Sequence, residues 1–351
     1  MRIKLCGFVV WAVFLACGLM SCQQEEIIIA AQPEAIGFGT PFIENATRAI
    51  DPSYGEDGVA LTQFNVWGTV AGNVNTSSPL LIYGGDAVTG SVGAATWSCD
   101  NKQYWVPSAE YKFVAITAAD KVTVSPTEGL PTSITYNART SPDADVMVST
   151  AAVTTDAHST PISGVNDSDV VPFTFQHLLS KMKFTFTTSS AGVFKVSNIA
   201  ISGLYAEGTY PIGVANPAWK LTLDGNGNPT TLGAVSFGNA INTDPQASVP
   251  ADIITSTNSV TSNYEHLFLP GSYADSNALT VTFNKDYYLS ASDKNPSSSE
   301  PVTATIPTLN ALPNYAYNIV VNLEGGSQIT FHINTMETWG TSTDVNPEEQ
   351  Q

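Results

Sequence analysis

The chain has 351 residues, of which only 13% are charged, and its formal net charge at pH 7 is −18. This length is sufficient for two domains of ordinary size, each with its own core. A surface with such an excess of acid repels nucleic acids and anionic lipids, so neither is an expected binding partner.

The first 21 residues have the layout of a secretory signal peptide. Arg2 and Lys4 form a short basic start, and an uncharged apolar run continues to Met20. This run of roughly 16 residues is slightly shorter than a membrane-spanning helix, and no basic stop-transfer cluster follows it. We therefore expect residues 1–21 to be removed during export.

The signal ends at Leu19-Met20-Ser21-Cys22, a sequence that resembles a bacterial lipobox. A lipobox is cut before the cysteine, here between Ser21 and Cys22, and the cysteine thiol carries a lipid. Several acyl chains on one residue hold a protein firmly on a membrane, because each buried methylene contributes ~0.8 kcal/mol. Residues 23–26 also resemble the acidic tag that sends some lipoproteins to the outside of the outer membrane. The alternative is an ordinary signal peptide that happens to contain Cys22.

Residues 22–48 lie between the predicted signal peptide and the strand-rich remainder of the chain. The stretch from Gln23 to about Ala35 has no sustained period of two and is expected to be a tether, whereas residues 35–43 contain enough β-formers for one strand. Arg48 follows in a polar segment, where a single arginine is by itself most simply explained as a solvated side chain.

The rest of the chain alternates in the manner of short β-strands separated by Gly, Pro, Ser and Asn. The composition, with 26 Gly and 21 Pro and no long run at helical spacing, is typical of an all-β protein. We expect an antiparallel sandwich of about seven strands in residues 49–170, and a second in residues 171–351. The clearest hairpin is the last, with one strand ending near Leu323, a turn at 325–327, and a return strand that carries Ile329, Phe331 and Ile333.

No motif in the sequence indicates catalysis, a cofactor or a metal. The four histidines are far apart along the chain, and no nucleophile elbow, zinc-binding helix or dinucleotide-binding loop is present. Residues 224–228 open like a calcium loop, but Pro229 and Val235 occupy positions where that loop needs Gly and Glu. Asp143 and Asp145 are only two positions apart and could pair as an acid and a base, yet they are better explained as part of a solvated turn. We therefore predict that the protein is not an enzyme.

Aromatic residues in the first half of the chain have two interpretations. Trp67, Trp97, Trp105 and Tyr111 are candidates for a platform that stacks on sugars. Alternating aromatic residues in strands are more often part of a core.

The order of these features resembles the fimbrillin family, the type V pilin subunits and accessory pilins of Gram-negative bacteria. The resemblance is carried by the lipobox and by five later segments. These are Asn45-Ala46-Thr47-Arg48-Ala49, Phe64-Asn65-Val66-Trp67-Gly68, Tyr104-Trp105 with Tyr111-Lys112-Phe113, His177-Leu178-Leu179-Ser180-Lys181-Met182-Lys183-Phe184, and Ile329-Thr330-Phe331-His332-Ile333 running to Trp339.

The resemblance implies two transthyretin-like β-sandwich domains and a route of assembly. The precursor would be an outer-membrane lipoprotein in which residues 22–48 form a lipidated pro-segment, and the first strand of this segment would lie in the protein's own N-terminal sheet. An arginine-specific protease would cut between Arg48 and Ala49, and a neighbouring subunit would fill the emptied groove with a C-terminal strand that contains Ile329, Phe331, Ile333 and Trp339. A stripped sheet edge strongly favours pairing with another extended chain.

The expected product is a homo- or heteropolymer of pilin subunits at the cell surface, with a host or bacterial surface receptor as a further partner. The function predicted from the sequence is therefore that of a structural subunit of a fimbria. The alternative is a monomeric surface lipoprotein that binds glycans through exposed aromatic residues.

Overall fold

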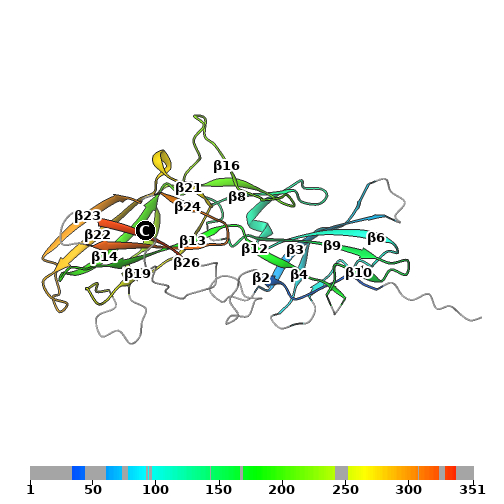
Figure 1. Ribbon diagram of the computed structural model, residues 1–351, viewed down its shortest axis with the longest axis horizontal. Helices are drawn as coiled ribbons and strands as arrows, with labels where there is room; N and C mark the ends of the chain where they lie inside the picture. The colour runs from blue at the N-terminus through cyan, green and yellow to red at the C-terminus, as the bar shows by residue number, and fades with distance from the viewer. Residues whose placement is uncertain are drawn as a thin grey trace, which may run out of the picture. The chain divides into compact units, whose positions relative to one another are not determined.

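The computed structural model describes residues 34–43, 61–72, 78–91, 94, 97–142, 144–166, 169–241, 252–306, 308–323 and 329–336. These residues form an all-β fold, which confirms the predicted class (Figure 1). Within these ranges there is no α-helix, and the two 3-10 helices are η2 (Ala119–Lys121) and η3 (Asp275–Asn277). The described residues accordingly contain no helix of the length and hydropathy that crossing a membrane would need.

The strands of the first half are short or medium in length and are separated by turns. They are β1 (Gly37–Phe38), β2 (Phe42–Ile43), β3 (Gln63–Gly72), β4 (Leu80–Thr89), β5 (Ser98–Cys99), β6 (Ala109–Ile116), β7 (Val122–Ser125), β8 (Ser133–Asn137), β9 (Met147–Thr155), β10 (Pro161–Ser163), β11 (Val170–Val171) and β12 (Thr174–His177).

The second half continues in the same way. Its strands are β13 (Ser180–Thr187), β14 (Val193–Ser202), β15 (Glu207–Pro211), β16 (Lys220–Leu221), β17 (Val235–Gly238), β18 (Ala240–Ile241), β19 (Val260–Ser262), β20 (His266–Phe268), β21 (Gly271–Tyr273), β22 (Thr280–Tyr288), β23 (Ser298–Thr305), β24 (Leu309–Ala311), β25 (Ala316–Leu323) and β26 (Ile329–Met336).

An eight-stranded sheet organises the first half of the chain. Its order is β2-β12-β9-β6-β3-β4-β5, with β10 added beside β9, and all of its pairs are antiparallel except β12 with β2. Strand β3 lies inside this sheet, between β6 and β4, and buries side chains on both faces. Phe64 and Val66 belong to one hydrophobic core, and Trp67 belongs to the other.

Two further sheets pack face to face in the second half. One is six-stranded, in the order β18-β19-β13-β25-β26 with β20 beside β13, and the other is four-stranded, in the order β17-β14-β22-β23. Phe184 and Phe186 of β13 meet Phe237 and Phe283 of the second sheet, with ring centroids 4.8 and 5.2 Å apart. This sandwich explains the alternation that the sequence shows in β13, where Met182 is buried and the side chains of Lys181 and Lys183 are partly exposed.

Strands from the two halves also share a sheet. Strands β7 and β8 pair with β15 and β16 in the order β16-β15-β8-β7, and Thr135 of β8 lies opposite Thr209 of β15. Strand β12 begins after the predicted domain boundary near residue 170, but it pairs with β9 of the eight-stranded sheet. Two hydrophobic cores are present among the described residues, and the division of the mature chain near residue 170 stays a prediction.

Candidate functional site

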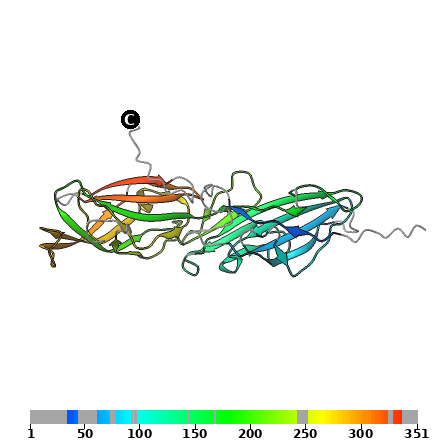
Figure 2. The same ribbon diagram turned by 90° about the horizontal axis from the view of Figure 1, so that it is seen from below.

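Residues 34–43 lie as an extended segment between two stretches of backbone. On one side β1 pairs in parallel with β11, and β2 pairs in parallel with β12 (Figure 1). Figure 2 shows the same relationship, with the blue segment beside green strands. On the other side the segment forms isolated antiparallel bridges, Ala35 with Tyr104 and Phe38 with Trp97. The segment therefore fills a groove that offers backbone hydrogen bonds along both edges.

Backbone hydrogen bonds hold this segment at both ends. The N–H of Trp105 donates to the carbonyl of Glu34 at 3.0 Å, and the N–H of Trp97 donates to the carbonyl of Phe38 at 2.8 Å. On the opposite side, the N–H of Phe42 donates to the carbonyl of Phe173 at 2.8 Å. The predicted strand within residues 35–43 thus occurs as two short ladders and two bridges.

Phe38 is the main apolar anchor of the segment. Its side chain is 1% exposed. Its ring centroid lies 5.5 Å from that of Tyr83, 6.2 Å from that of Phe113 and 5.8 Å from that of Phe173. Ile36 and Ile43 are buried in the same core. Burial of a side chain of this size stabilises a fold by about 1.5–3 kcal/mol, so the segment contributes substantially to the core that it completes.

The segment is one residue longer than the strands beside it. Phe38 lies opposite Val171 and Phe42 lies opposite Thr174, so three residues on one strand face two on the other. This is the geometry of a β-bulge, which bends the bulged strand and interrupts the ladder. The bulge explains why Phe42 is 45% exposed although Phe38 and Ile43 are buried.

The second candidate site is strand β26, which contains most of the predicted donor residues. It lies at the edge of the six-stranded sheet. It pairs antiparallel with β25 over its full length, from Ile329 opposite Leu323 to Met336 opposite Ala316. Ile329, Phe331 and Ile333 are half-buried and pack against the larger core. Among the described residues, β26 has no strand on its other side.

The edge strands β23 and β26 differ in their protection. Strand β23 has an exposed Glu300 and an exposed Pro301 in its middle, and both residue types discourage another strand from pairing. Strand β26 contains no proline and no Asp, Glu, Lys or Arg. Strand β26 itself therefore lacks the charges and the proline that discourage strand pairing.

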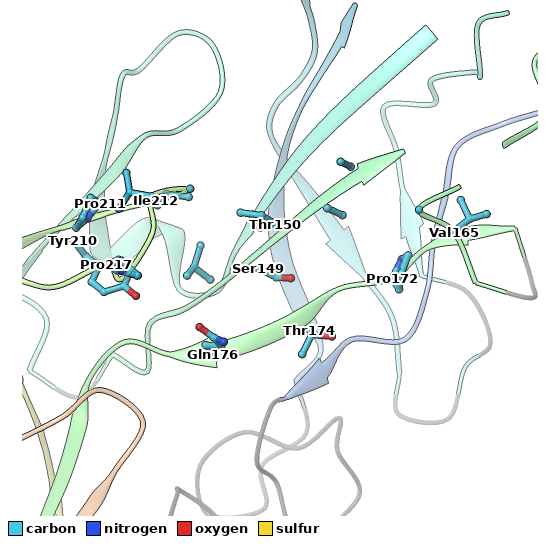
Figure 3. A pocket seen from close by; sticks show the side chains of 16 residues that line it. Ser149, Thr150, Val165, Pro172, Thr174, Gln176, Tyr210, Pro211, Ile212 and Pro217 are labelled. Carbon is cyan, nitrogen blue, oxygen red and sulfur yellow. The ribbon is translucent and has the colours of Figure 1, made fainter. Parts of the chain in front are cut away.

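A cavity of about 600 Å³ lies between β9 and β12 on one side and residues 210–217 on the other. Figure 3 shows polar side chains such as Ser149 and Gln176 on the first side, with Pro211 and Pro217 opposite. Its lining contains no Asp, Glu, Lys, Arg or His. The phenol of Tyr210, whose pKa is raised by burial, is therefore the one titratable side chain in this lining.

The aromatic residues considered for sugar stacking belong to the two hydrophobic cores. Trp97, Trp105 and Tyr111 are at most 3% exposed, and Trp67 is 7% exposed. A second cavity, of about 450 Å³, is lined by Trp67, Gln63 and Asn65, but the indole there is nearly covered. These four residues cannot form an open platform, and the core interpretation is the one the geometry supports.

The histidines lie in separate places. His158 and His332 are exposed, whereas His266 packs on the ring of Phe237. His177 is 4% exposed, and its Nδ1 lies 2.8 Å from a carboxylate oxygen of Asp145. Sequence reasoning missed this pair, because only the pairing of β12 with β9 brings the two residues together. Among the described residues, no three His, Cys, Asp or Glu side chains form a metal-binding group.

Several predicted site residues lie outside the described residues. These are the signal cleavage and lipidation residues Ser21 and Cys22, the protease site Arg48 and Ala49, the donor residue Trp339, and Asp143. Cys99 is a free, half-buried cysteine on β5, and burial raises the pKa of its thiol. Residues 224–228 form the tight turn expected of a hairpin, in which Asp224 accepts hydrogen bonds from the N–H groups of Asn226 and Asn228.

Comparison with known sequences decides the family, because the fimbrillin-like family profile matches residues 47–343. The chain belongs to the fimbrillin-like family. No curated protein matches this fimbrillin-like chain in sequence. Membership supports a role as a fimbrial subunit at the cell surface that assembles with other such subunits. The family is one of structural and adhesion proteins and not one of enzymes.

Two solved structures share the fold of this fimbrillin-like protein. A fimbrial protein from Bacteroides vulgatus is 15% identical, with a TM-score of 0.58, and the match covers 87% of this chain and 100% of that one. A candidate cell adhesion protein from Bacteroides ovatus is also 15% identical, with a TM-score of 0.51, and the match covers 89% and 100% of the two chains. At this level of identity the likeness establishes the fold.

Proposed function

We propose that the protein is a structural subunit of a surface fimbria that is exported as a lipoprotein precursor and assembles by strand exchange. In this scheme Cys22 carries the lipid, and an arginine-specific protease cuts between Arg48 and Ala49. The cut separates residues 34–43 covalently from the groove in which they lie. A neighbouring subunit then supplies an extended segment to that groove.

The observation that carries this proposal is the burial of Ile36, Phe38 and Ile43 in the segment just before Arg48. The segment places Phe38 in a cluster of aromatic rings and has hydrogen-bonding partners on both sides. Its departure would expose the apolar groove and leave unpaired backbone groups on Trp97 and Phe173. Such a groove is a strong acceptor for another extended chain.

Strand β26 supports the second half of the scheme. Among the described residues, its eight residues pair with β25 alone, and the strand contains neither a charged residue nor a proline. Ile329, Phe331 and Ile333 alternate with Thr330, His332 and Asn334, which is the pattern of a strand that inserts one face into a groove. A head-to-tail contact of this kind does not close into a ring, so it generates a filament.

The test is the N-terminus and the assembly state of protein extracted from the cell surface. We expect the native chain to begin at Ala49 and to run as a heat-resistant ladder, and we expect Arg48→Ala to begin at Cys22 and to stay monomeric. Arg48→Lys is the matched control, because it keeps the positive charge but removes the guanidinium that an arginine-specific protease recognises. A chain that is acylated and monomeric whatever residue occupies position 48 contradicts the scheme.

A further inference from the structure

Two glycines of the buried segment face one valine at very short range. A Cβ atom on Gly37 would lie 2.8 Å from Cγ1 of Val170. A Cβ atom on Gly39 would lie 3.1 Å from Cγ2 of the same valine and 3.2 Å from Nδ2 of Asn166. Val170 therefore occupies the space into which side chains at positions 37 and 39 would point.

Val170 has little freedom to move aside. It is 5% exposed, and its β-branched side chain is stiff about χ1. The N–H of Asn166 donates to the carbonyl of Val170 at 3.2 Å, and the N–H of Val170 donates to Oδ1 of Asn166 at 3.4 Å. The N–H of Asp169, which has a left-handed backbone with φ 58°, donates to the carbonyl of Asn166 at 3.0 Å. These hydrogen bonds hold Val170 beside the groove.

The groove thus imposes a pattern on the segment that fills it. Apolar side chains are needed at the positions of Ile36, Phe38 and Ile43, which are all buried. Residues without a side chain are needed at the positions of Gly37 and Gly39, which flank the main anchor. A bulky residue between two glycines is therefore the recognition feature.

The C-terminal segment of this chain does not carry that pattern. Residues 329–351 contain a single glycine, Gly340. With Phe331 at the position of Phe38, Thr330 and His332 would take the two glycine positions and meet Val170. With Trp339 at that position, Gly340 would satisfy one glycine position, and Thr338 would occupy the other.

We propose that this groove, once residues 34–43 have left it, accepts an extended segment of a different subunit. In that segment a bulky apolar residue has a glycine on each side. The groove rejects the C-terminal segment of a second copy of this chain. The proposal rests on the strand-exchange function proposed above and makes the assembly heterotypic at this groove. Val170 is the specificity-determining residue.

The steric contact is tested first in the intact chain by thermal unfolding of Gly37→Ala, Val170→Ala and the double variant. We expect Gly37→Ala to lower the unfolding midpoint of the native protein. In the Val170→Ala background, the same substitution should lower the midpoint by less than half as much. Gly225→Ala is the matched control, since a Cβ atom there meets no other atom within 4 Å. Equal effects of Gly37→Ala in the two backgrounds overturn the assignment of Val170.

Selectivity is tested on the full chain after a site for a sequence-specific protease has been placed between residues 44 and 60. The folded protein is cut, and fluorescent peptides compete for the groove. They are residues 34–43, the same peptide with Gly37→Val and Gly39→Val, and residues 329–343. We expect the native 34–43 peptide to enter, and the other two to bind at least tenfold more weakly. Val170→Ala should reduce the difference in affinity between the native 34–43 peptide and its Gly37→Val, Gly39→Val form.

The outcomes separate the two proposals. Binding of the 329–343 peptide as tightly as the 34–43 peptide overturns the selectivity while strand exchange stands. An unchanged ratio between the two 34–43 peptides in Val170→Ala overturns the role of the valine. Entry of no peptide at all overturns the strand-exchange function itself.

Discussion

Phe38 stacks on Phe173, with ring centroids 5.8 Å apart and an interplanar angle of 23°. Phe173 precedes β12, and its carbonyl also accepts the hydrogen bond from Phe42. Phe173 therefore holds the N-terminal segment both by its ring and by its backbone. This contact ties the integrity of the groove to the presence of the segment.

Replacement of Phe38 by alanine should lower the free energy of unfolding by about 3–5 kcal/mol, because it removes a buried ring and leaves a cavity. Phe42→Ala is the matched control. It removes the same side chain from the same segment at a position that is 45% exposed, and should cost less than about 1 kcal/mol. Urea unfolding of the full chain measures both. Equal effects would mean that Phe38 does not anchor the segment.

Replacement of Phe331 by alanine should destabilise the protein by roughly half as much as a fully buried phenylalanine, about 2 kcal/mol, because its ring is half-buried against the larger core. His332→Ala, one residue along on the exposed face, should stay within about 0.5 kcal/mol. Hydrogen exchange gives a second readout. Amides of β26 should exchange faster than those of β13, which has strands on both sides. Equal protection would contradict the view of β26 as a releasable edge.

Replacement of Asp145 by alanine should cost about 1–3 kcal/mol, because it removes the carboxylate that lies 2.8 Å from Nδ1 of the buried His177. Asp120→Ala provides the comparison, since Asp120 pairs with Lys121 and both side chains are more than half exposed. That change should stay within about 0.5 kcal/mol. Chemical unfolding at pH 7 distinguishes the two. A loss at Asp145 no larger than that at Asp120 would show that the pair adds nothing to stability.

The stability of the protein should fall as pH rises above about 10. Burial raises the pKa of Tyr273 well above its ordinary value, and its hydroxyl donates to the carbonyl of Leu269 at 2.6 Å. A tyrosine in the unfolded chain ionises above about pH 10, while the folded chain keeps the proton, so the stabilisation is complete below pH 10 and is lost above it.

Tyr273→Phe should reduce this alkaline slope by about one proton, or about 1.4 kcal/mol per pH unit. Tyr264→Phe, which removes the same hydroxyl from a side chain that is 57% exposed, is the matched control. Unfolding free energies measured between pH 9 and 11 test the difference. An unaltered slope in Tyr273→Phe would show that this hydroxyl is not the group responsible.

Local pattern was sufficient to predict the all-β class. Buried and partly exposed side chains alternate along β13 and β25, because side chains on a strand point to opposite faces with a period of two. The strand within residues 35–43 and the hairpin of β25 and β26 were also recognisable from composition and turn residues.

Pairing between strands that are distant along the chain could not be predicted from the sequence. Nothing in residues 122–137 indicates that β8 pairs with β15, whose residues lie about seventy positions later. The contact of Val170 with Gly37 and Gly39 was equally hidden, since it requires β1 and β11 to lie side by side in register. The bond between His177 and Asp145 depends on the same kind of tertiary placement. Periodicity reports which face of a strand is buried, but it carries no information about the neighbouring strand.

The covalent connection between residues 34–43 and the rest of the chain has a consequence for competition. A short tether holds a binding segment at an effective concentration on the order of millimolar. A free subunit at micromolar concentration would face roughly a thousandfold disadvantage against the chain's own strand. In the uncut protein, residues 34–43 thus act as an intramolecular competitive inhibitor of the groove. After one peptide bond has been broken, they compete with the segment of another subunit without the advantage of the tether.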